Sequence, residues 1–319
     1  MSQPIAMQSL KFIVLYPRCG LGNRFRAMAC AYALSKVTNA DLYINWEPTE
    51  DCAISWTDMF VASFPMPRVS TDELSNKYPN TKVFFNDKVH TDVFLDTNVK
   101  TKLYEGVIIS GGHDFKHPLM SANDFLFIKH TYYQLLFSNL LPSIKDEIST
   151  VSNIHDMIGV HMRIFIPKYD TADKYDFEND NILDMTTLYM NNSRIRNKDT
   201  RFFVSCNDPK YINILRDMFG HDTIVTYHGL YHEDDDRNSK KGIVNAIVNM
   251  ILLSQTKAIL GTYRSSFSDE AAIIGFIPKL CTSNKQHSEQ YHCYGYEEHN
   301  KKSYIMYSLP VVSKLFSEL

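Results

Sequence analysis

The sequence predicts an α/β fold with a largely parallel, doubly wound sheet. Short apolar runs of strand length alternate with longer helical stretches along most of the chain, which is the pattern of repeated strand–helix units. Several runs are apolar throughout, as is typical of strands buried on both faces of a parallel sheet. The length of 319 residues gives a prior of two domains of roughly 150 residues each.

The first unit of this pattern is a strand, a turn and a helix. Residues 12–16 (FIVLY) form an apolar run of strand length, which Pro17 ends. An alanine-rich stretch follows, so we expect a helix over 23–37, with Asn23 as its cap. Residues 41–46 supply the next strand, so the whole segment is a βαβ unit.

The same alternation continues toward the C-terminus. A polar, charged stretch over 141–153 precedes a fresh strand, so we expect one domain over 1–150 and a second over 151–300. Apolar residues recur at helical spacing after Pro310, so 301–319 is expected to carry a helix that packs back on the body. The other expected strands cover 106–110, 157–161, 201–205, 223–226 and 258–261, and the other expected helices cover 125–137, 183–194, 209–219 and 242–255.

Composition and charge narrow the class of protein. Apolar residues make up 44% and charged residues 22% of the chain, which excludes wholesale disorder. A formal net charge of -3 argues against general binding to nucleic acid or to anionic membranes, since both need a basic surplus. The chain has no apolar run of bilayer length, no basic secretory signal and no paired cysteine motif, so we expect no transmembrane segment and a cytoplasmic location.

The turn between the first strand and the first helix has the form of an anion site. Gly20 and Gly22 allow close backbone approach, and Asn23 and Arg24 lie at a helix N-terminus, where free N–H groups attract anions. Phe25 stands where a dinucleotide fingerprint needs glycine, which disfavours an NAD-dependent oxidoreductase, and the lysine of a phosphate-binding P-loop is missing. The alternative interpretation is a tight turn that merely contains glycine.

Two later turns carry further candidates for anion binding. His161 and Arg163 end an expected strand, and side chains two residues apart in an extended chain point to the same side. An arginine fork suits a diphosphate, although Arg163 could equally pair with a surface carboxylate. Arg264, Ser265 and Ser266 lie in another strand-to-helix turn, where helix capping accounts for the serines but not for the arginine.

Carboxylates occur at two places where an acceptor hydroxyl could meet a general base. Glu47 and Asp51 follow the second expected strand, and Asp114 follows the strand expected over 106–110. The acidic run over 232–236 is flanked by basic and polar residues, which indicates a solvated loop rather than a metal site. We therefore expect no bound metal.

Together these turns resemble the GT-B fold fucosyltransferase superfamily, in particular its nodulation-type α1,6-fucosyltransferases; eukaryotic α1,6-fucosyltransferases and protein O-fucosyltransferases are other members. The similar segments run in order along the chain: GLGNRFRA over 20–27, the tryptophan and acidic segment over 46–52, DMF over 58–60, His161 with Arg163, ND over 207–208 and SSFS over 265–268. Two positions depart from the pattern of the family. Asn249 stands where an acidic residue usually faces the nucleotide, and Ile164 stands where some relatives have a second arginine. An amide can donate as well as accept, whereas a carboxylate only accepts, so Asn249 bears on guanine specificity.

The resemblance implies two Rossmann-like domains facing a central cleft. It also implies inverting, metal-independent transfer of fucose from GDP-fucose to a glycan or glycoconjugate acceptor, with no cofactor besides this donor substrate and no nucleic-acid partner. Arg163 would stabilise the charge on the departing β-phosphate, and Asp51, Glu47 or Asp114 would act as the base. The donor would contact Gly20, Gly22, Asn23, Arg24, His161, Arg163, Asp208, Asn249, Arg264, Ser265, Ser266 and Phe267.

Two other functions fit the same residues. A related transferase could use another sugar nucleotide, such as a xylosyl or rhamnosyl donor, because the choice of sugar depends on a few contacts. The scaffold could also serve as a non-catalytic module that binds a nucleotide sugar or a glycan without turnover. Slow release of nucleoside diphosphate in the absence of acceptor would separate a catalyst from such a module.

Overall fold

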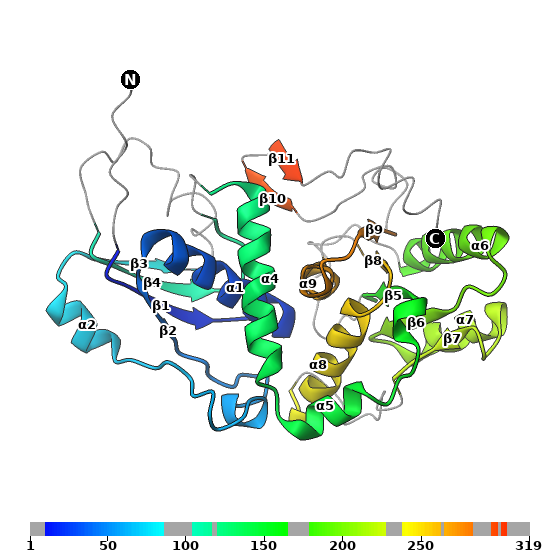
Figure 1. The fold of residues 1–319 in the computed structure, drawn as a ribbon, viewed down its shortest axis with the longest axis horizontal. Coiled ribbons are helices and arrows are strands. Elements are labelled where there is room, and N and C mark those ends of the chain that lie inside the picture. Colours follow the sequence, from blue (N-terminus) through cyan, green and yellow to red (C-terminus); the bar gives the residue numbers. More distant parts are fainter. Residues whose placement is uncertain are drawn as a thin grey trace. The chain divides into compact units, whose positions relative to one another are not determined.

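The chain divides into two compact units, each built on its own sheet (Figure 1). Unit 1 comprises residues 1–141 and 237–243, and unit 2 comprises residues 142–236 and 244–319. The computed structural model describes residues 10–85, 104–116, 120–164, 179–227, 238–262, 265–282, 295–298 and 301–304.

Unit 1 contains a parallel sheet of four strands in the order β2-β1-β4-β3. The strands are β1 (Phe12–Pro17), β2 (Asp41–Ile44), β3 (Thr81–Phe85) and β4 (Gly106–Gly111). β1 lies between β2 and β4, and its residues 12–15 are buried, as a continuous apolar run predicts. Gly106 lies opposite Phe12, whose ring fills the place that a side chain at Gly106 would take.

Three helices pack on this sheet or on one another. α1 (Leu21–Thr38) contacts β1, and it packs against α4 (Ala122–Ser138) through the stacked rings of Tyr32 and Tyr132, whose centroids are 4.7 Å apart. α2 (Thr71–Lys77) contributes Leu74 to the apolar cluster on the sheet face that carries Phe12 and Val14. A single-turn helix, η1 (Trp56–Asp58), follows β2.

The start of α1 differs from the expectation. The helix begins at Leu21, and Gly20 is its N-cap residue without a side-chain capping bond. Asn23 therefore lies inside the first turn, and its expected role as the cap was wrong. Cys19 adopts a left-handed backbone (φ 66°), which turns the chain into the helix before Asn23 is reached.

Unit 2 contains a parallel sheet of five strands in the order β7-β6-β5-β8-β9. The strands are β5 (Ile158–Met162), β6 (Phe202–Cys206), β7 (Ile224–Val225), β8 (Ile259–Gly261) and β9 (Lys279–Cys281). The three residues Ile158, Val160 and Met162 of β5 point into one apolar core, and Gly159 and His161 alternate with them on the opposite face.

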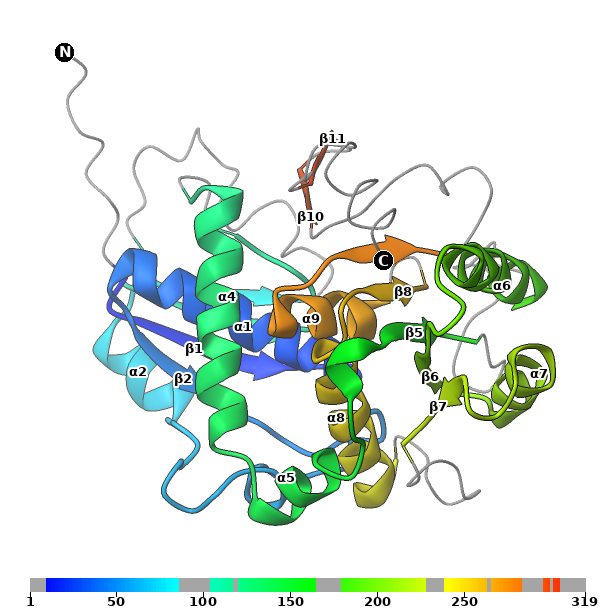
Figure 2. The same cartoon turned by 45° about the vertical axis from the view of Figure 1, so that its right-hand side comes forward.

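Helices cover both faces of this sheet (Figures 1 and 2). α6 (Asn179–Arg196) and α7 (Pro209–Phe219) join the apolar core through Met190 and Leu215. α8 (Lys240–Ser254) and α9 (Ser266–Gly275) lie on the other face. A side chain at Gly159 would lie 3.1 Å from Leu253 and 2.7 Å from the Thr256 hydroxyl, so glycine lets α8 approach the sheet closely. The doubly wound arrangement predicted from the sequence is confirmed here.

The remaining elements are short. α5 (Pro142–Ile148) and η2 (Ile154–Asp156) precede β5, and β10 (Gly295–Glu298) pairs with β11 (Lys301–Tyr304) in an antiparallel hairpin. Every strand and helix expected between residues 106 and 261 is present, whereas β3, β9, β10, β11, α2 and α5 were not expected. The C-terminal helical segment was expected over 301–319, but residues 301–304 form strand β11 instead. The helix expected after Pro310 lies outside the described residues and stays a prediction.

Candidate functional site

The first candidate site lies in unit 2, where β5 and β8 end side by side. The order β7-β6-β5-β8-β9 reverses direction between these two strands, and open α/β sheets bind ligands beyond the carboxyl ends of strands at such a switch point. His161 on β5 is in register with Gly261 on β8. Arg163 and Thr262 follow directly, so the chain brings His161 and Arg163 to this edge.

A network of hydrogen bonds fixes the turn that carries Arg163. The backbone N–H of Arg163 donates to the Thr262 hydroxyl over 2.9 Å, and that hydroxyl donates to the carbonyl of His161 over 3.2 Å. The guanidinium donates to the carbonyl of Ile164. The amide of Asn207 binds the backbone of Ile164 twice, accepting over 2.6 Å and donating over 2.9 Å. Thr262 and Asn207 therefore position Arg163, a role that the sequence pattern gave no signal for.

His161 is a neutral imidazole in this site. Its side chain is buried, its ring stacks on Phe267 with centroids 5.0 Å apart, and its Nδ1 has no hydrogen-bond partner. Burial lowers the pKa of His161 to about 3, with further lowering from the positive charges of Lys279 and Arg163. At neutral pH the ring can therefore bind a ligand through hydrogen bonds but not as a cation.

Asn249 lies on α8, the helix that packs on the sheet face carrying Gly159 and His161. The N–H of Lys257 donates to the carbonyl of Met157 over 2.9 Å, so α8 runs antiparallel to β5. Leu253 packs against Gly159. Asn249 is four residues before Leu253 on the helix, and His161 is two residues after Gly159 on the strand. Both separations correspond to about 6 Å along the same direction, so we expect Asn249 and His161 to lie near each other.

In the side-chain amide of Asn249 the nitrogen makes a hydrogen bond within the protein and the oxygen does not. Its side chain is 3% exposed; Nδ2 donates to the carbonyl of Asn245 over 2.9 Å, and Oδ1 has no partner. Buried polar atoms normally find partners, so each orphan needs an explanation. In the described part of the chain the buried side-chain atoms without a partner are His161 Nδ1, Asn249 Oδ1 and Arg216 Nε.

The N-terminus of α9 completes this edge of unit 2. Ser265 is the N-cap residue, one of the two positions expected for the cap, but its hydroxyl makes no capping hydrogen bond. The N–H of Ser265 donates to the carbonyl of Thr262 over 3.3 Å. Ser266 and Phe267 form the first turn and are half-buried. The ammonium of Lys279 is buried, donates to the same carbonyl over 3.2 Å and pairs with Asp269 of α9.

Of two further residues expected to contact the donor, Asp208 is described by the structure and Arg264 is not. Asp208 is the N-cap residue of α7, where its carboxylate accepts from the N–H of Lys210 over 2.9 Å. Arg264 lies outside the described residues, as does the acidic run over 232–236. Contact of either residue with a nucleotide stays a prediction.

The glycine turn of unit 1 is held by a buried arginine. Arg24 is fully buried, and its guanidinium donates to the carbonyls of Cys19 (2.8 Å) and Glu47 (2.6 Å) and to the Thr49 hydroxyl (2.6 Å). It also lies over the Trp46 ring at 4.9 Å. Burial lowers the pKa of this guanidinium. The side chain thus ties the turn to the segment after β2, and this internal role was not expected from the sequence.

Gly112, which directly follows β4, packs against the same turn. A side chain at Gly112 would lie 2.7 Å from the carbonyl of Arg18 and 2.9 Å from Asn23. By contrast, a side chain at Gly20 would meet its nearest neighbour, the carbonyl of Asp51, at an ordinary 3.9 Å. Close packing inside this turn therefore depends on Gly112 and not on Gly20, and close approach of a ligand to Gly20 and Gly22 stays a prediction. Gly22 is buried in the first turn of α1, beside the half-buried Asn23.

The three candidate carboxylates have different environments. Asp114 pairs with Lys129 at 3.1 Å and with Arg26 at 3.4 Å, and it accepts from the Cys30 thiol. Burial alone would raise the pKa of Asp114, but these two positive charges and the thiol hydrogen bond outweigh burial and lower the pKa to about 2.

The other two carboxylates follow β2. Glu47 has a side chain that is 53% exposed and pairs with Arg18 at 3.3 Å. Asp51 is half-buried. A strongly acidic carboxylate that already holds two cations is a poor proton acceptor, so the surroundings favour Glu47 or Asp51 over Asp114.

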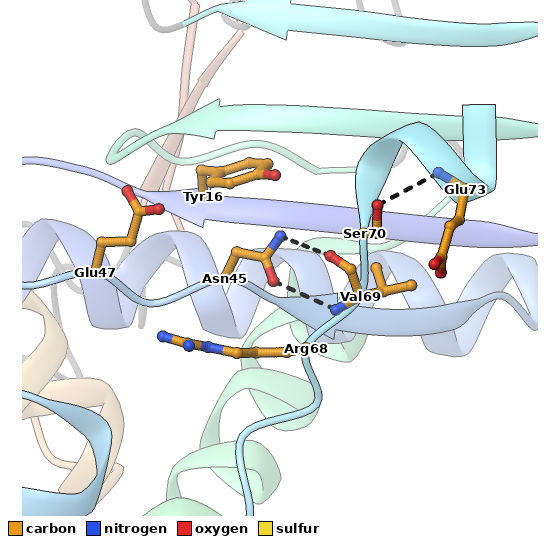
Figure 3. A pocket seen from close by; sticks show the side chains of 7 residues that line it. All are labelled: Tyr16, Asn45, Glu47, Arg68, Val69, Ser70 and Glu73. Atoms are coloured by element: carbon orange, nitrogen blue, oxygen red, sulfur yellow. Dashed lines mark hydrogen bonds between the residues drawn. The ribbon is translucent and has the colours of Figure 1, made fainter. Parts of the chain in front are cut away.

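A polar pocket of about 610 Å³ adjoins Glu47 in unit 1 (Figure 3). It is lined by Tyr16, Asn45, Glu47, Arg68, Val69, Ser70 and Glu73. These residues come from the end of β1, the segment after β2 and the start of α2. No sequence motif pointed to this pocket, because its walls are far apart in the chain.

The described residues include no group of three or more His, Cys, Asp or Glu side chains arranged to bind a metal ion. None of their helices combines the length and the apolar character needed to cross a bilayer.

The fold can be compared with known proteins. No family model and no curated protein matches the sequence. Among solved structures, a variant of Arabidopsis thaliana FUT1 in complex with GDP aligns with a TM-score of 0.57 and 13% identity, covering 93% of this chain and 78% of that one. NodZ α-1,6-fucosyltransferase soaked with GDP-fucose aligns with a TM-score of 0.54 and 15% identity, over 84% of this chain and 93% of that one. The NodZ from Bradyrhizobium aligns with a TM-score of 0.52 and 14% identity, over 84% and 94%. The predicted GT-B fold is thereby confirmed.

Proposed function

We propose that this chain is a glycosyltransferase that transfers fucose from GDP-fucose to a glycan or glycoconjugate hydroxyl, with inversion and without a metal ion. The observation that carries the proposal is the polar group at the switch point of unit 2. There Arg163 accompanies two buried atoms that lack partners, His161 Nδ1 and Asn249 Oδ1. Such atoms cost free energy unless a ligand satisfies them. Solved structures of the same fold hold GDP or were soaked with GDP-fucose, and a nucleoside diphosphate sugar has the chemistry that this group needs.

The hydrogen bonding of the Asn249 amide supports guanine as the nucleotide base of the donor. With Nδ2 bound to the Asn245 carbonyl, the atom left for a ligand is the oxygen Oδ1, which accepts through two lone pairs. The Watson–Crick edge of guanine offers adjacent N–H donors. The amide therefore imitates the acceptor side of the carboxylate that the family usually has at this position.

Arg163 would stabilise the charge that develops when the sugar leaves. The bond between C1 of fucose and the β-phosphate oxygen breaks, and its electron pair remains on the phosphate. Thr262 and Asn207 hold the backbone of Arg163 and Ile164, and the guanidinium donates to the Ile164 carbonyl. A charge positioned in this way is preorganised for the developing phosphate charge, which is how such groups lower a barrier. The first turn of α9, at Ser266 and Phe267, would add backbone N–H donors. The acceptor oxygen attacks C1 from the opposite side, and its proton passes to a carboxylate, for which Glu47 and Asp51 are the candidates that the surroundings favour.

Replacing Arg163 tests this role directly. Arg163→Ala should lower the rate of GDP release from GDP-fucose by about 10²–10³, the usual effect of removing one donor to developing charge. Arg201→Ala is the matched control: Arg201 is exposed, precedes β6 at the opposite edge of the same sheet, and donates to the carbonyl of Asp222. Its rate should equal that of the wild type. A near wild-type rate for Arg163→Ala, at an unchanged unfolding midpoint, would remove Arg163 from the mechanism.

The same preparations separate the alternative functions. GDP should raise the midpoint of thermal unfolding more than UDP does, and the wild type should slowly release GDP from GDP-fucose without acceptor. A larger shift with UDP would favour another sugar nucleotide, such as a xylosyl or rhamnosyl donor. Binding of GDP with no release at any protein concentration would identify a non-catalytic module.

A further inference from the structure

The polar pocket of unit 1 has a fixed shape. The Asn45 amide donates to the carbonyl of Val69 over 3.2 Å and accepts from its N–H over 3.5 Å. Arg68 donates to the carbonyl of Trp46 over 3.0 Å. These bonds join the segment after β2 to the segment before α2, so the two walls are held in place without a ligand. A preformed pocket loses little freedom on binding, which favours affinity.

An aromatic ring lies between the two walls. Tyr16 is half-buried at the end of β1, and its hydroxyl donates to the Thr71 hydroxyl over 3.4 Å. Figure 3 shows this ring with Glu47 on one side and Glu73 on the other, and with Asn45 and Arg68 below it in the view. A tyrosine ring offers an apolar face, whereas the surrounding groups offer planar acceptors and donors.

The charges around the pocket balance one another. Glu47 and Glu73 carry negative charge, Arg68 carries positive charge, and Arg18 pairs with Glu47 while lying 5.8 Å from the centre of the Tyr16 ring. A strongly anionic ligand would meet two carboxylates, and a cationic one would meet two guanidinium groups. A neutral ligand with many hydroxyls can instead donate to the carboxylates and accept from Arg68.

We infer that this pocket binds a neutral saccharide ring of the acceptor, an inference that rests on the proposed function. The apolar face of the sugar packs on Tyr16, and its hydroxyls bond to Glu73 and Arg68. A hydroxyl of the sugar at the other end of the pocket donates to the Glu47 carboxylate. Glu73 and Arg68 then determine which acceptor sugar is accepted.

Saccharide binding to the full chain tests the pocket itself. The probes are lactose, cellobiose and N,N′-diacetylchitobiose, observed by saturation-transfer NMR and titrated to obtain Kd. At least one should bind, and Glu73→Gln should weaken its binding about tenfold or more, as is usual when a hydrogen bond to a charged group is weakened. Asp72→Asn is the matched control, since Asp72 is an exposed neighbour on α2 that does not line the pocket. Its Kd should equal that of the wild type.

Several results would overturn the inference. These are no binding of any neutral probe, equal Kd values for Glu73→Gln and wild type, or preferential binding of the anionic sialyllactose or of cationic deacetylated chitobiose. A thermal shift with GDP, measured on the same samples, separates this outcome from failure of the proposed function. If GDP binds and the neutral sugars do not, only the pocket inference fails. If sugars bind through Glu73 and GDP does not bind, the pocket stands and the transferase proposal fails.

Discussion

His161 shows how strongly a buried position changes a titratable residue. Its sequence position beside Arg163 suggested a partner for phosphate, and a protonated ring would have suited that role. The structure surrounds the ring with Phe267, Lys279 and Arg163, and its pKa is lowered to about 3. The ring is therefore uncharged at neutral pH, and any contribution it makes to binding should not vary across this range.

The low pKa of His161 predicts a specific loss of stability in acid. The ring is protonated more readily in the unfolded chain, where its pKa is near 6.5, than in the folded chain. Stability is thus fully present above pH 6.5 and falls as the pH drops toward 3, by about 2 kcal/mol at pH 5. The unfolding free energy, measured by urea denaturation, should therefore differ between pH 7.5 and pH 5 by about 2 kcal/mol less in His161→Gln than in the wild type.

The matched control for this prediction is His221→Gln, which replaces an exposed histidine and should keep the wild-type dependence on pH. The titration of Asp114 does not interfere, because its pKa is lowered from 3.8 to about 2 and its stabilising effect is lost only below pH 4. An unchanged acid dependence in His161→Gln would show that the ring is not buried in neutral form.

At the scale of elements, the turn between β1 and α1 depends on a residue outside its own motif. The glycine at position 20 has φ −69°, a conformation open to any residue, and space for a side chain. Gly112, contributed by the loop after β4, is the residue whose lack of a side chain lets that loop reach the turn. Arg24 closes the same turn from the other side by binding the segment after β2.

Alanine substitutions at these two glycines should have unequal effects. Gly112→Ala places a methyl group 2.7 Å from the Arg18 carbonyl, so the backbone must shift, and overpacking of this kind costs about 1–3 kcal/mol. Gly20→Ala changes only an N-cap residue and should cost less than about 1 kcal/mol. Chemical denaturation of both variants measures the difference. An equal loss of stability would mean that the turn is not packed as described.

At the scale of the whole molecule, the chain itself can supply the positive charge that the proposed transfer needs. The net charge of the protein is -3, yet arginine, lysine and a helix N-terminus gather at the switch point of unit 2. Fixed cations and backbone dipoles can neutralise a departing diphosphate without a metal ion.

Metal independence can be tested on the intact protein. GDP release from GDP-fucose should keep its rate after dialysis against EDTA, and added Mn²⁺ or Mg²⁺ should not increase it, because Arg163 supplies the positive charge. The dialysed protein should also retain its unfolding midpoint. A rate that falls with EDTA and returns with Mn²⁺ would contradict the prediction.

The sequence by itself determined the α/β fold, the succession of its main strands along the chain and the location of His161 and Arg163 at a strand end. Continuous apolar runs and helical spacing are local signals, so they can be read along one segment at a time. Only the tertiary structure decided which polar groups remain available. Arg24 is used internally, Asp114 is held by two cations, Asn249 keeps only its oxygen, and the pocket around Tyr16 is formed from segments up to some 57 residues apart. Burial and pairing of this kind arise when distant segments meet, and spacing within one segment carries no record of them.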